Sequence, residues 1–233
     1  MKKDETEIAR LKVKVKKWQP LEICTTSDWC VIDFGDLSLG TGRRVRRFYE
    51  QKGKYEITIT AEKLRKIRIK GCQIDYANFS RCVYLKTICI SDTGLGGLNI
   101  KGCRELKLLS CRNNRLEYLD LYGFTKLRRL KCDHNKLEII RLGRNFSLSY
   151  LQCNDNRLTD IYIPYKNSLR HLDCSNNQLS KDNLKKMFAR LFRQMPEKTG
   201  KVIFEGNPGT LCCNMRKFIV KGWKIGKYRS QAA

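Results

Sequence analysis

The sequence predicts a mostly β solenoid, in which stacked coils each add one strand to a parallel sheet. Two observations predict this fold. A phrase of the form Leu-x-x-Leu-x-Cys-x-x-Asn-x-Leu returns every 21 residues without a gap, and a repeat of fixed period is the signature of a solenoid. Inside each copy apolar and polar residues alternate, as in Leu109-Ser110-Cys111, which is the pattern of a half-buried strand.

Six copies of the phrase keep one phase, and they begin at residues 64, 85, 106, 127, 148 and 169. The first two are weaker and carry Cys72 and Thr93 in place of the Asn. We predict that the inward Leu and Cys side chains form buried columns. Each Asn is expected to bond to the backbone of its own turn and of the adjacent coil. The Cys column is Cys111, Cys132, Cys153 and Cys174, and the Asn column is Asn114, Asn135, Asn156 and Asn177.

The second half of each copy, such as Leu116-x-x-Leu119-x-Leu121, alternates again and has no helical period, so we expect a second extended wall. These units resemble leucine-rich repeats, and in particular the 21-residue bacterial class with Cys in the consensus. The resemblance covers residues 64–184, about half of the chain. It implies a leucine-rich repeat solenoid of six coils, and a surface or secreted interaction protein with no shared catalytic residue.

The chain before the repeats has a different pattern. A charged tail over residues 1–10 precedes alternating stretches at 11–15 and 55–60, so residues 11–63 predict a small antiparallel β module of about four strands. The phrases IDFGD and RFYEQKGKYEITI are similar to small immunoglobulin-like modules of bacterial surface proteins, with Phe34 where those modules have Trp. Such a module would cap the open first coil.

The chain after the repeats predicts a second cap over residues 185–233. Ser180 is a favourable N-cap for a helix over about 181–195, which Pro196 would end. Apolar residues three to four positions apart give this helix one core face. We further expect a strand at 202–204, a turn at 206–209, a short helix around 214–220 and a strand near 223–225.

The twelve cysteines show neither the Cys-x-x-Cys nor the Cys/His spacing of a zinc site. We interpret the Cys column as buried free thiols, because parallel side chains do not converge into disulfides. A disulfide between Cys24 and Cys30 or between Cys82 and Cys103 remains an alternative. The vicinal pair Cys212–Cys213 is interpreted as structural.

Candidate catalytic groups are few. His134 and His171 are the only histidines, and no motif assigns a nucleophile to either. Asp33 and Asp36 flank a turn, and two carboxylates are too few for a calcium site. A thiol enzyme that uses Cys89 is the weakest of the hypotheses. We therefore predict a protein that is not an enzyme and has no cofactor or metal.

Charge is the second signal, since the formal net charge is +25. Part of this excess is explained by solubility and by the protection of sheet edges. The rest indicates an anionic partner. We predict a binding surface on the open face of the sheet for a protein or an acidic glycan. The alternative is sequence-independent binding to nucleic acid or to an anionic surface such as lipid headgroups, driven by the positive charge. The candidate residues are Lys66, Arg68, Lys70, Arg112, Arg129, Lys131, Tyr150, Gln152 and His171.

The compartment is predicted less directly. No run of about 18 apolar residues could span a membrane, and the charged start Met1-Lys2-Lys3-Asp4 lacks the apolar segment of a signal peptide. The family resemblance implies a cell-surface or secreted protein, and a cytoplasmic location is the alternative. We expect a monomer.

Overall fold

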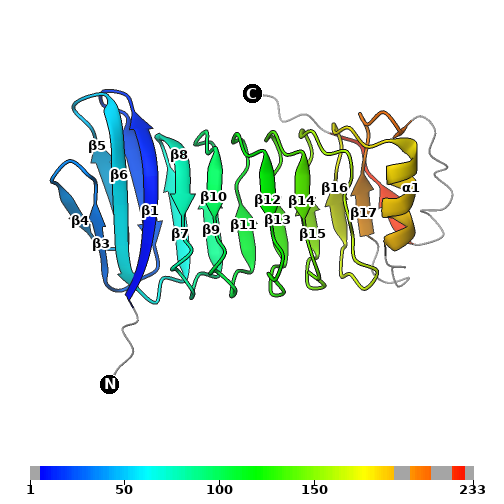
Figure 1. Ribbon diagram of the computed structural model, residues 1–233, viewed down its shortest axis with the longest axis horizontal. Coiled ribbons are helices and arrows are strands. Elements are labelled where there is room, and N and C mark those ends of the chain that lie inside the picture. Colours follow the sequence, from blue (N-terminus) through cyan, green and yellow to red (C-terminus); the bar gives the residue numbers. More distant parts are fainter. Residues whose placement is uncertain (1–5, 192–199, 211–221, 229–233) are drawn as a thin grey trace, which may run out of the picture. The chain divides into compact units, whose positions relative to one another are not determined.

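The structure is a computed structural model that describes residues 6–191, 200–210 and 222–228. The chain divides into two compact units, Met1–Leu116 and Glu117–Ala233. Each unit contains stacked β coils (Figure 1). The predicted solenoid with a parallel sheet is confirmed in both of them.

The first unit begins with a β module that has more strands than the four or so expected. Its strands are β1 (Thr6–Val15), β2 (Pro20–Thr25), β3 (Cys30–Asp33), β4 (Leu39–Thr41), β5 (Arg44–Phe48) and β6 (Gly53–Glu62). All pairs among them are antiparallel. Neither β4 nor β5 has a buried face. Hydrophobic alternation in the sequence therefore could not predict either strand. β1 begins at Thr6, inside the segment that was expected to be a tail.

The coils of the first unit continue both sheets of this module. Strands β7 (Lys66–Lys70), β9 (Thr87–Ile90) and β11 (Leu108–Ser110) pair in parallel, and β2 joins them antiparallel to β7. On the second wall, β8 (Gln73–Asn78) pairs in parallel with β10 (Gly97–Asn99) and antiparallel with β1. The module is therefore hydrogen-bonded to both walls of the first coil.

The second unit carries the later coils. Its sheet contains, in parallel order, β13 (Arg129–Lys131), β15 (Tyr150–Gln152), β16 (His171–Asp173), β17 (Gly200–Ile203) and β18 (Trp223–Ile225). On its second wall β12 (Tyr118–Asp120) pairs in parallel with β14 (Ile139–Arg141). The strands expected at 202–204 and near 223–225 are present as β17 and β18, which extend the sheet beyond the sixth repeat.

The Asn column does what the sequence predicts. Asn156 accepts a hydrogen bond from Leu137 N at 2.9 Å, and its amide donates to the carbonyls of Cys132 at 3.0 Å and Cys153 at 3.1 Å. Asn177 repeats this arrangement one coil later. The amide thus joins one coil to the next inside the core.

Helix α1 (Lys181–Arg190) follows the sixth repeat, and Ser180 caps it by accepting a hydrogen bond from Asn183 N at 3.2 Å. The expectation that the helix runs to residue 195 is wrong. Its last carbonyl, that of Arg190, accepts a hydrogen bond from the side chain of Asn167 at 2.9 Å, and Leu191 is already extended. Leu184, Met187 and Phe188 form the buried face, as expected. The helix expected at 214–220 lies outside the described residues.

The remaining local expectations concern thiols and turns. The cysteines that the structure describes are free thiols, including Cys24, Cys30, Cys82 and Cys103. The two carboxylates that flank the first turn accept hydrogen bonds from its backbone. Asp33 accepts one from Gly35 N at 2.8 Å, and Asp36 accepts one from Ser38 N at 3.2 Å. No helix within the described ranges is long and apolar enough to span a bilayer.

Candidate binding face

The strands alternate so that the predicted binding residues point away from the core. On β7, Ile67 and Ile69 are fully buried, whereas the residues on either side of them are exposed. Each later strand also has one fully buried central Leu, but most of the residues beside it are only half-exposed, and Asp173 of β16 is buried. The predicted residues lie on β7 (Lys66, Arg68, Lys70), just after β11 (Arg112), on β13 (Arg129, Lys131), on β15 (Tyr150, Gln152) and on β16 (His171).

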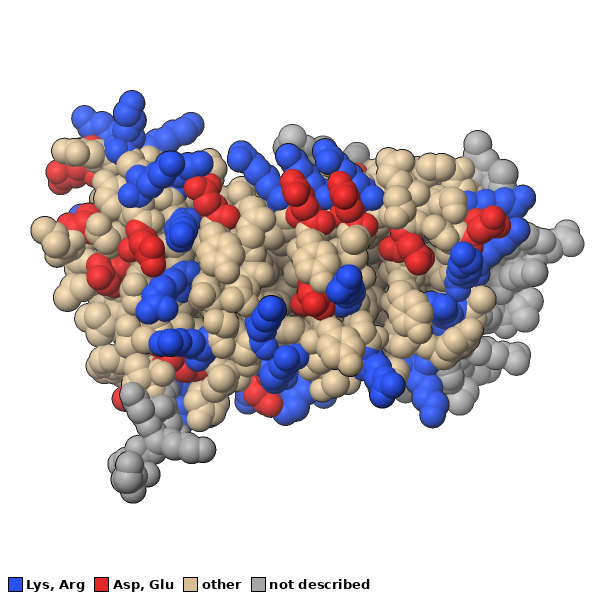
Figure 2. Space-filling model, viewed as in Figure 1, with Lys and Arg blue, Asp and Glu red and all other residues tan. Residues whose placement is uncertain are grey.

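Charge alone does not single out one surface. On the face shown in Figure 2, Lys and Arg side chains are mixed with Asp and Glu and with uncharged surface. The sheet faces of the two units are described next from the local arrangement of their side chains.

In the first unit the structure gathers Lys66, Arg68 and Lys70 around a shallow hollow of about 320 Å³. The register places Cys24 of β2 between Arg44 of β5 and Arg68 of β7. Arg44 was not predicted, because β5 lies outside the repeats and shows no apolar alternation. Four cationic side chains thus line one hollow, and their charges favour an anionic group there.

A carboxylate already lies among these cations. Glu22 pairs with Arg44 at 3.3 Å and accepts a hydrogen bond from the Cys24 thiol at 3.4 Å. The hydrogen bond from Arg44, followed by that from Cys24, lowers the pKa of Glu22. Burial, followed by the hydrogen bond to Glu22, raises the pKa of Cys24, so this thiol is not activated as a nucleophile.

The candidate thiol Cys89 lies in a neighbouring hollow of about 340 Å³, which also includes Arg68 and Lys70. Among the described residues that line it there is no histidine. The structure therefore supplies Cys89 with no imidazole base of the kind a thiol enzyme uses.

In the second unit the face centres on two stacked rings. Tyr150 and His171 are opposite each other in register, and their rings are 4.2 Å apart at an interplanar angle of 5°. Lys131 Nζ lies 5.7 Å from the centroid of the Tyr150 ring, and the Tyr150 hydroxyl donates to Gln152 Oε1 at 3.0 Å. Four of the nine predicted residues thus form one contact network.

The register also extends this network to cations on both sides. Arg129 lies opposite Tyr150 on β13, and Lys201 lies opposite His171 on β17. Burial, followed by the charges of Lys201 and Lys131, lowers the pKa of His171. The stack therefore presents a neutral imidazole between cationic side chains at neutral pH. Lys201 was missed because β17 lies after the last recognisable copy of the repeat.

An acidic cluster follows the same strands, and the sequence reasoning missed it too. His134 lies between Asp133 at 3.2 Å and Asp155 at 3.3 Å, and the Tyr228 hydroxyl donates to Asp155 at 2.9 Å. Burial raises the pKa of Asp173, and the nearby carboxylates of Asp133 and Asp155 raise it further. The hydrogen bonds from Ser175 lower this pKa, but by less than burial raises it. No group of ligands suited to a metal ion occurs among the residues that the structure describes.

Comparison with known proteins identifies the repeat. The model of the Leucine Rich Repeat family matches residues 168–191, a range that contains the whole of β16 and of α1. No curated protein matches the chain. Together with the solenoid geometry, the match supports a leucine-rich repeat protein, whose fold is typical of protein-interaction modules.

Proposed function

We propose that this leucine-rich repeat chain is a non-enzymatic binding module whose sheet face holds a partner protein that bears acidic side chains. The observation that carries the proposal is the stacked pair of Tyr150 and His171 with Lys131 beside it. A rigid aromatic pair offers a large contact area at little entropic cost, and Tyr is enriched at the centres of protein interfaces. The neighbouring cations suit carboxylates of the partner.

The mixed charge of this face favours a protein over a polyanion. Asp173 on β16 lies in register with Gln152 on β15, which in turn lies in register with Lys131 on β13. Asp173 is buried, with 8% of its surface exposed, but its ionised form would disfavour a continuous phosphate or sulfate backbone, whereas a protein surface can match cations and carboxylates individually. An acidic glycan fits the more uniformly basic hollow around Arg68 better.

Nucleic acid is the second candidate, because stacked aromatics flanked by cations are also what single strands bind. Salt dependence separates the two. Binding to a single-stranded oligonucleotide that is absent even at about 50 mM salt excludes the nucleic-acid function.

Three finer features belong to the same proposal. We propose that the module of β1 to β6 caps the first coil, that the repeats are of the 21-residue bacterial class with a Cys column, and that the protein acts at the bacterial surface. What supports them is the pairing of β1 with β8 and of β2 with β7, the repeat phrase itself, and the resemblance that the phrase carries.

The test is a charge reversal on the face. We would identify partners of the full chain by cross-linking, and then compare the Arg129→Glu/Lys131→Glu variant with the unchanged chain. Tyr150→Ala is the second variant, and both are expected to weaken binding at least tenfold, which corresponds to about 1.4 kcal/mol. Lys136→Glu/Arg157→Glu, at exposed positions outside the sheet strands, is the matched control. Unchanged binding of every partner to the first two variants would exclude this surface.

A further inference from the structure

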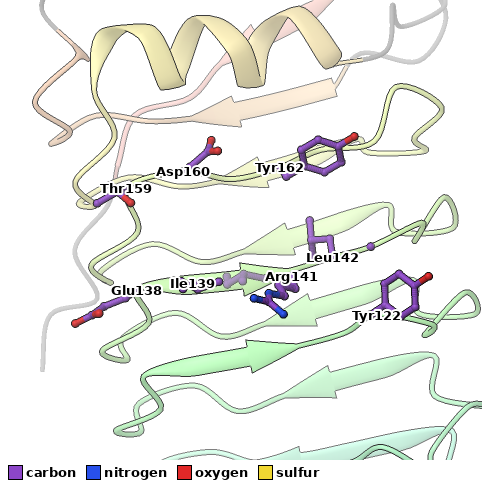
Figure 3. A pocket seen from close by; sticks show the side chains of 10 residues that line it. Tyr122, Glu138, Ile139, Arg141, Leu142, Thr159, Asp160 and Tyr162 are labelled. Atoms are coloured by element: carbon purple, nitrogen blue, oxygen red, sulfur yellow. The ribbon is translucent and has the colours of Figure 1, made fainter.

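The second wall of the second unit carries a groove that no sequence pattern indicated. It lies between the fourth and fifth coils and has a volume of about 360 Å³. Figure 3 shows the rings of Tyr122 and Tyr162 at one end of it, on either side of Leu142, and Glu138 at the other end. The lining residues are Tyr122, Glu138, Ile139, Ile140, Arg141, Leu142, Gly143, Thr159, Asp160 and Tyr162.

Two local features keep the groove open. Gly143 has a positive φ of 59°, and a Cβ there would lie 3.0 Å from Cδ2 of Tyr122, so any larger residue would crowd the ring. The fifth coil also departs from the pattern. Within the described residues of this unit, β14 pairs only with β12, because the segment 160–163 forms no strand. The groove lies along the edge of β14 that has no paired strand.

The walls are aromatic and accessible. Tyr122 is 69% exposed, Tyr162 is 51% exposed and Ile139 is 50% exposed. Neighbouring exposed apolar side chains of this kind are typical of interaction sites. The Arg190 guanidinium lies 4.0 Å from the centroid of the Tyr162 ring and 5.5 Å from that of Tyr165. This cation–π contact holds Tyr162 in place before any partner arrives.

The far end of the groove is acidic, which is unusual in a chain of net charge +25. Glu138 and Asp160 line it, and neither takes part in an ion pair among the described residues. Two exposed carboxylates repel polyanions and attract a cationic side chain. The groove therefore suits a different ligand from the basic sheet faces.

The length of the groove specifies the ligand further. Glu138 and Leu142 are four residues apart along an extended chain, about 13 Å. A peptide in the polyproline II conformation rises ~3.1 Å per residue and covers this length in about four residues. Aromatic-lined grooves commonly hold such preformed, extended segments.

We propose that this groove docks an extended peptide segment of a partner protein. The segment carries an Arg or Lys that reaches Glu138 and Asp160, and about four residues away a Pro or aromatic side chain that enters between Tyr122 and Tyr162. The site is separate from the sheet face, so the chain holds partners on two opposite walls of the second unit.

The test uses synthetic eight-residue peptides and the full chain labelled with ¹⁵N. The first peptide has one arginine and, four positions later, one tryptophan, with proline and alanine elsewhere. The second has glutamate in place of the arginine. We expect the arginine peptide to shift the amide signals of Leu142, Gly143 and Tyr162, with a dissociation constant of about 1 mM or tighter. The glutamate peptide should bind at least fivefold more weakly.

Variants then assign the contacts. Glu138→Gln/Asp160→Asn keeps the shape of both exposed side chains and should weaken the arginine peptide about fivefold. Tyr162→Ala should abolish the shifts. Tyr165→Ala is the matched control, because this exposed ring also contacts Arg190 but does not line the groove. Circular dichroism confirms that each variant is folded.

The sheet-face variant Arg129→Glu/Lys131→Glu should bind the peptide with unchanged affinity. The experiment therefore tests the groove independently of the proposed binding site on the sheet face. The proposal is overturned if the two peptides bind equally, if the shifts fall outside the lining residues, or if no shift occurs at about 1 mM peptide.

Discussion

The phenol ring of Tyr150 lies parallel to the imidazole ring of His171, with their centroids 4.2 Å apart. The in-register pairing of β15 and β16 places both side chains side by side on the same face. The imidazole is half-buried, and Lys201 and Lys131 are close enough to affect its protonation. The strand pairing that stacks the two rings therefore also sets the surroundings that determine the pKa of His171.

We predict that His171 titrates below its ordinary pKa of 6.5. The unfolded chain then binds the proton more readily than the folded chain, so the free energy of unfolding should decrease as the pH falls from about 6.5 toward the pKa of the folded state. Above this range neither state is protonated and the effect vanishes. An NMR titration of the imidazole signals measures the pKa, and urea unfolding at several pH values measures the stability.

Variants identify the cause of this shift. Lys201→Gln should raise the pKa of His171, and Lys131→Gln should raise it by less, because each removes a neighbouring positive charge. Lys136→Gln, on an exposed side chain after the strand, should leave it unchanged. A pKa of His171 at or above 6.5 in the unchanged chain would contradict the prediction.

The Asn column should be a main source of stability. Replacing Asn156 by Ala removes the acceptor of Leu137 N and the donor to Cys132 O and Cys153 O. Buried backbone groups then lose their partners, so we expect the free energy of unfolding to fall by about 3 kcal/mol. Urea unfolding followed by circular dichroism measures this loss. Gln178→Ala, at an exposed position, should change it by less than about 0.5 kcal/mol, and a similar loss in both variants would refute the role.

The thiols should divide sharply by reactivity. Burial raises the pKa of Cys72 to about 12 and that of Cys103 to about 12, and it raises the pKa of Cys153 well above its ordinary value. In the folded chain iodoacetamide should therefore modify Cys24 and Cys89, which are only half-buried, long before the other three. Mass spectrometry of labelled peptides measures the rates.

Unfolding is the control for this prediction. In denaturant, without a reducing agent, all the described cysteines should be labelled at similar rates. An unfolded, unreduced chain without free thiols would show that these cysteines are paired and would refute the interpretation of the column.

One glycine of the first unit should tolerate no side chain. A Cβ at Gly102 would lie 1.9 Å from the carbonyl oxygen of Ser80, in the preceding coil. Because two coils approach each other through backbone there, we expect Gly102→Ala to lower the free energy of unfolding by about 2 kcal/mol or more. At Gly96 the nearest such contact is 3.2 Å, so Gly96→Ala should cost less. The same urea experiment compares the two, and equal losses would contradict the argument.

Inside the repeats the sequence predicted the inward Leu and Cys columns and the outward Lys66 and Arg68, but not the burial of Asn154 and Asp173. A fixed period together with strand alternation determines which residues are inward, and this is why the outward placement of Lys66 and the proximity of Tyr150 and His171 could be anticipated. Their stacking angle and the protonation of His171 depend on side-chain packing, which a repeat pattern does not describe.

Outside the repeats there is no fixed period from which the position of a side chain could be predicted. Arg44 and Lys201 come from strands with no repeat phrase, so only the observed pairing brings them to the face. The early end of α1 depends on Asn167, which is 23 residues before Arg190 in the chain. The groove beside Gly143 arises from a missing side chain and a missing strand, and such absences leave no hydrophobic signal.

The antiparallel pairing of β1 with β8 and of β2 with β7 also limits where further repeats can be inserted into the chain during evolution. A duplicated stretch of 21 residues adds a coil that needs a parallel neighbour on each side. That condition holds between β7 and β9, between β9 and β11, and between β13, β15 and β16. An insertion before β7 would instead separate the module from its partners. Natural length variants should therefore differ in whole units downstream of residue 70, while the module and the first coil are inherited together as one block.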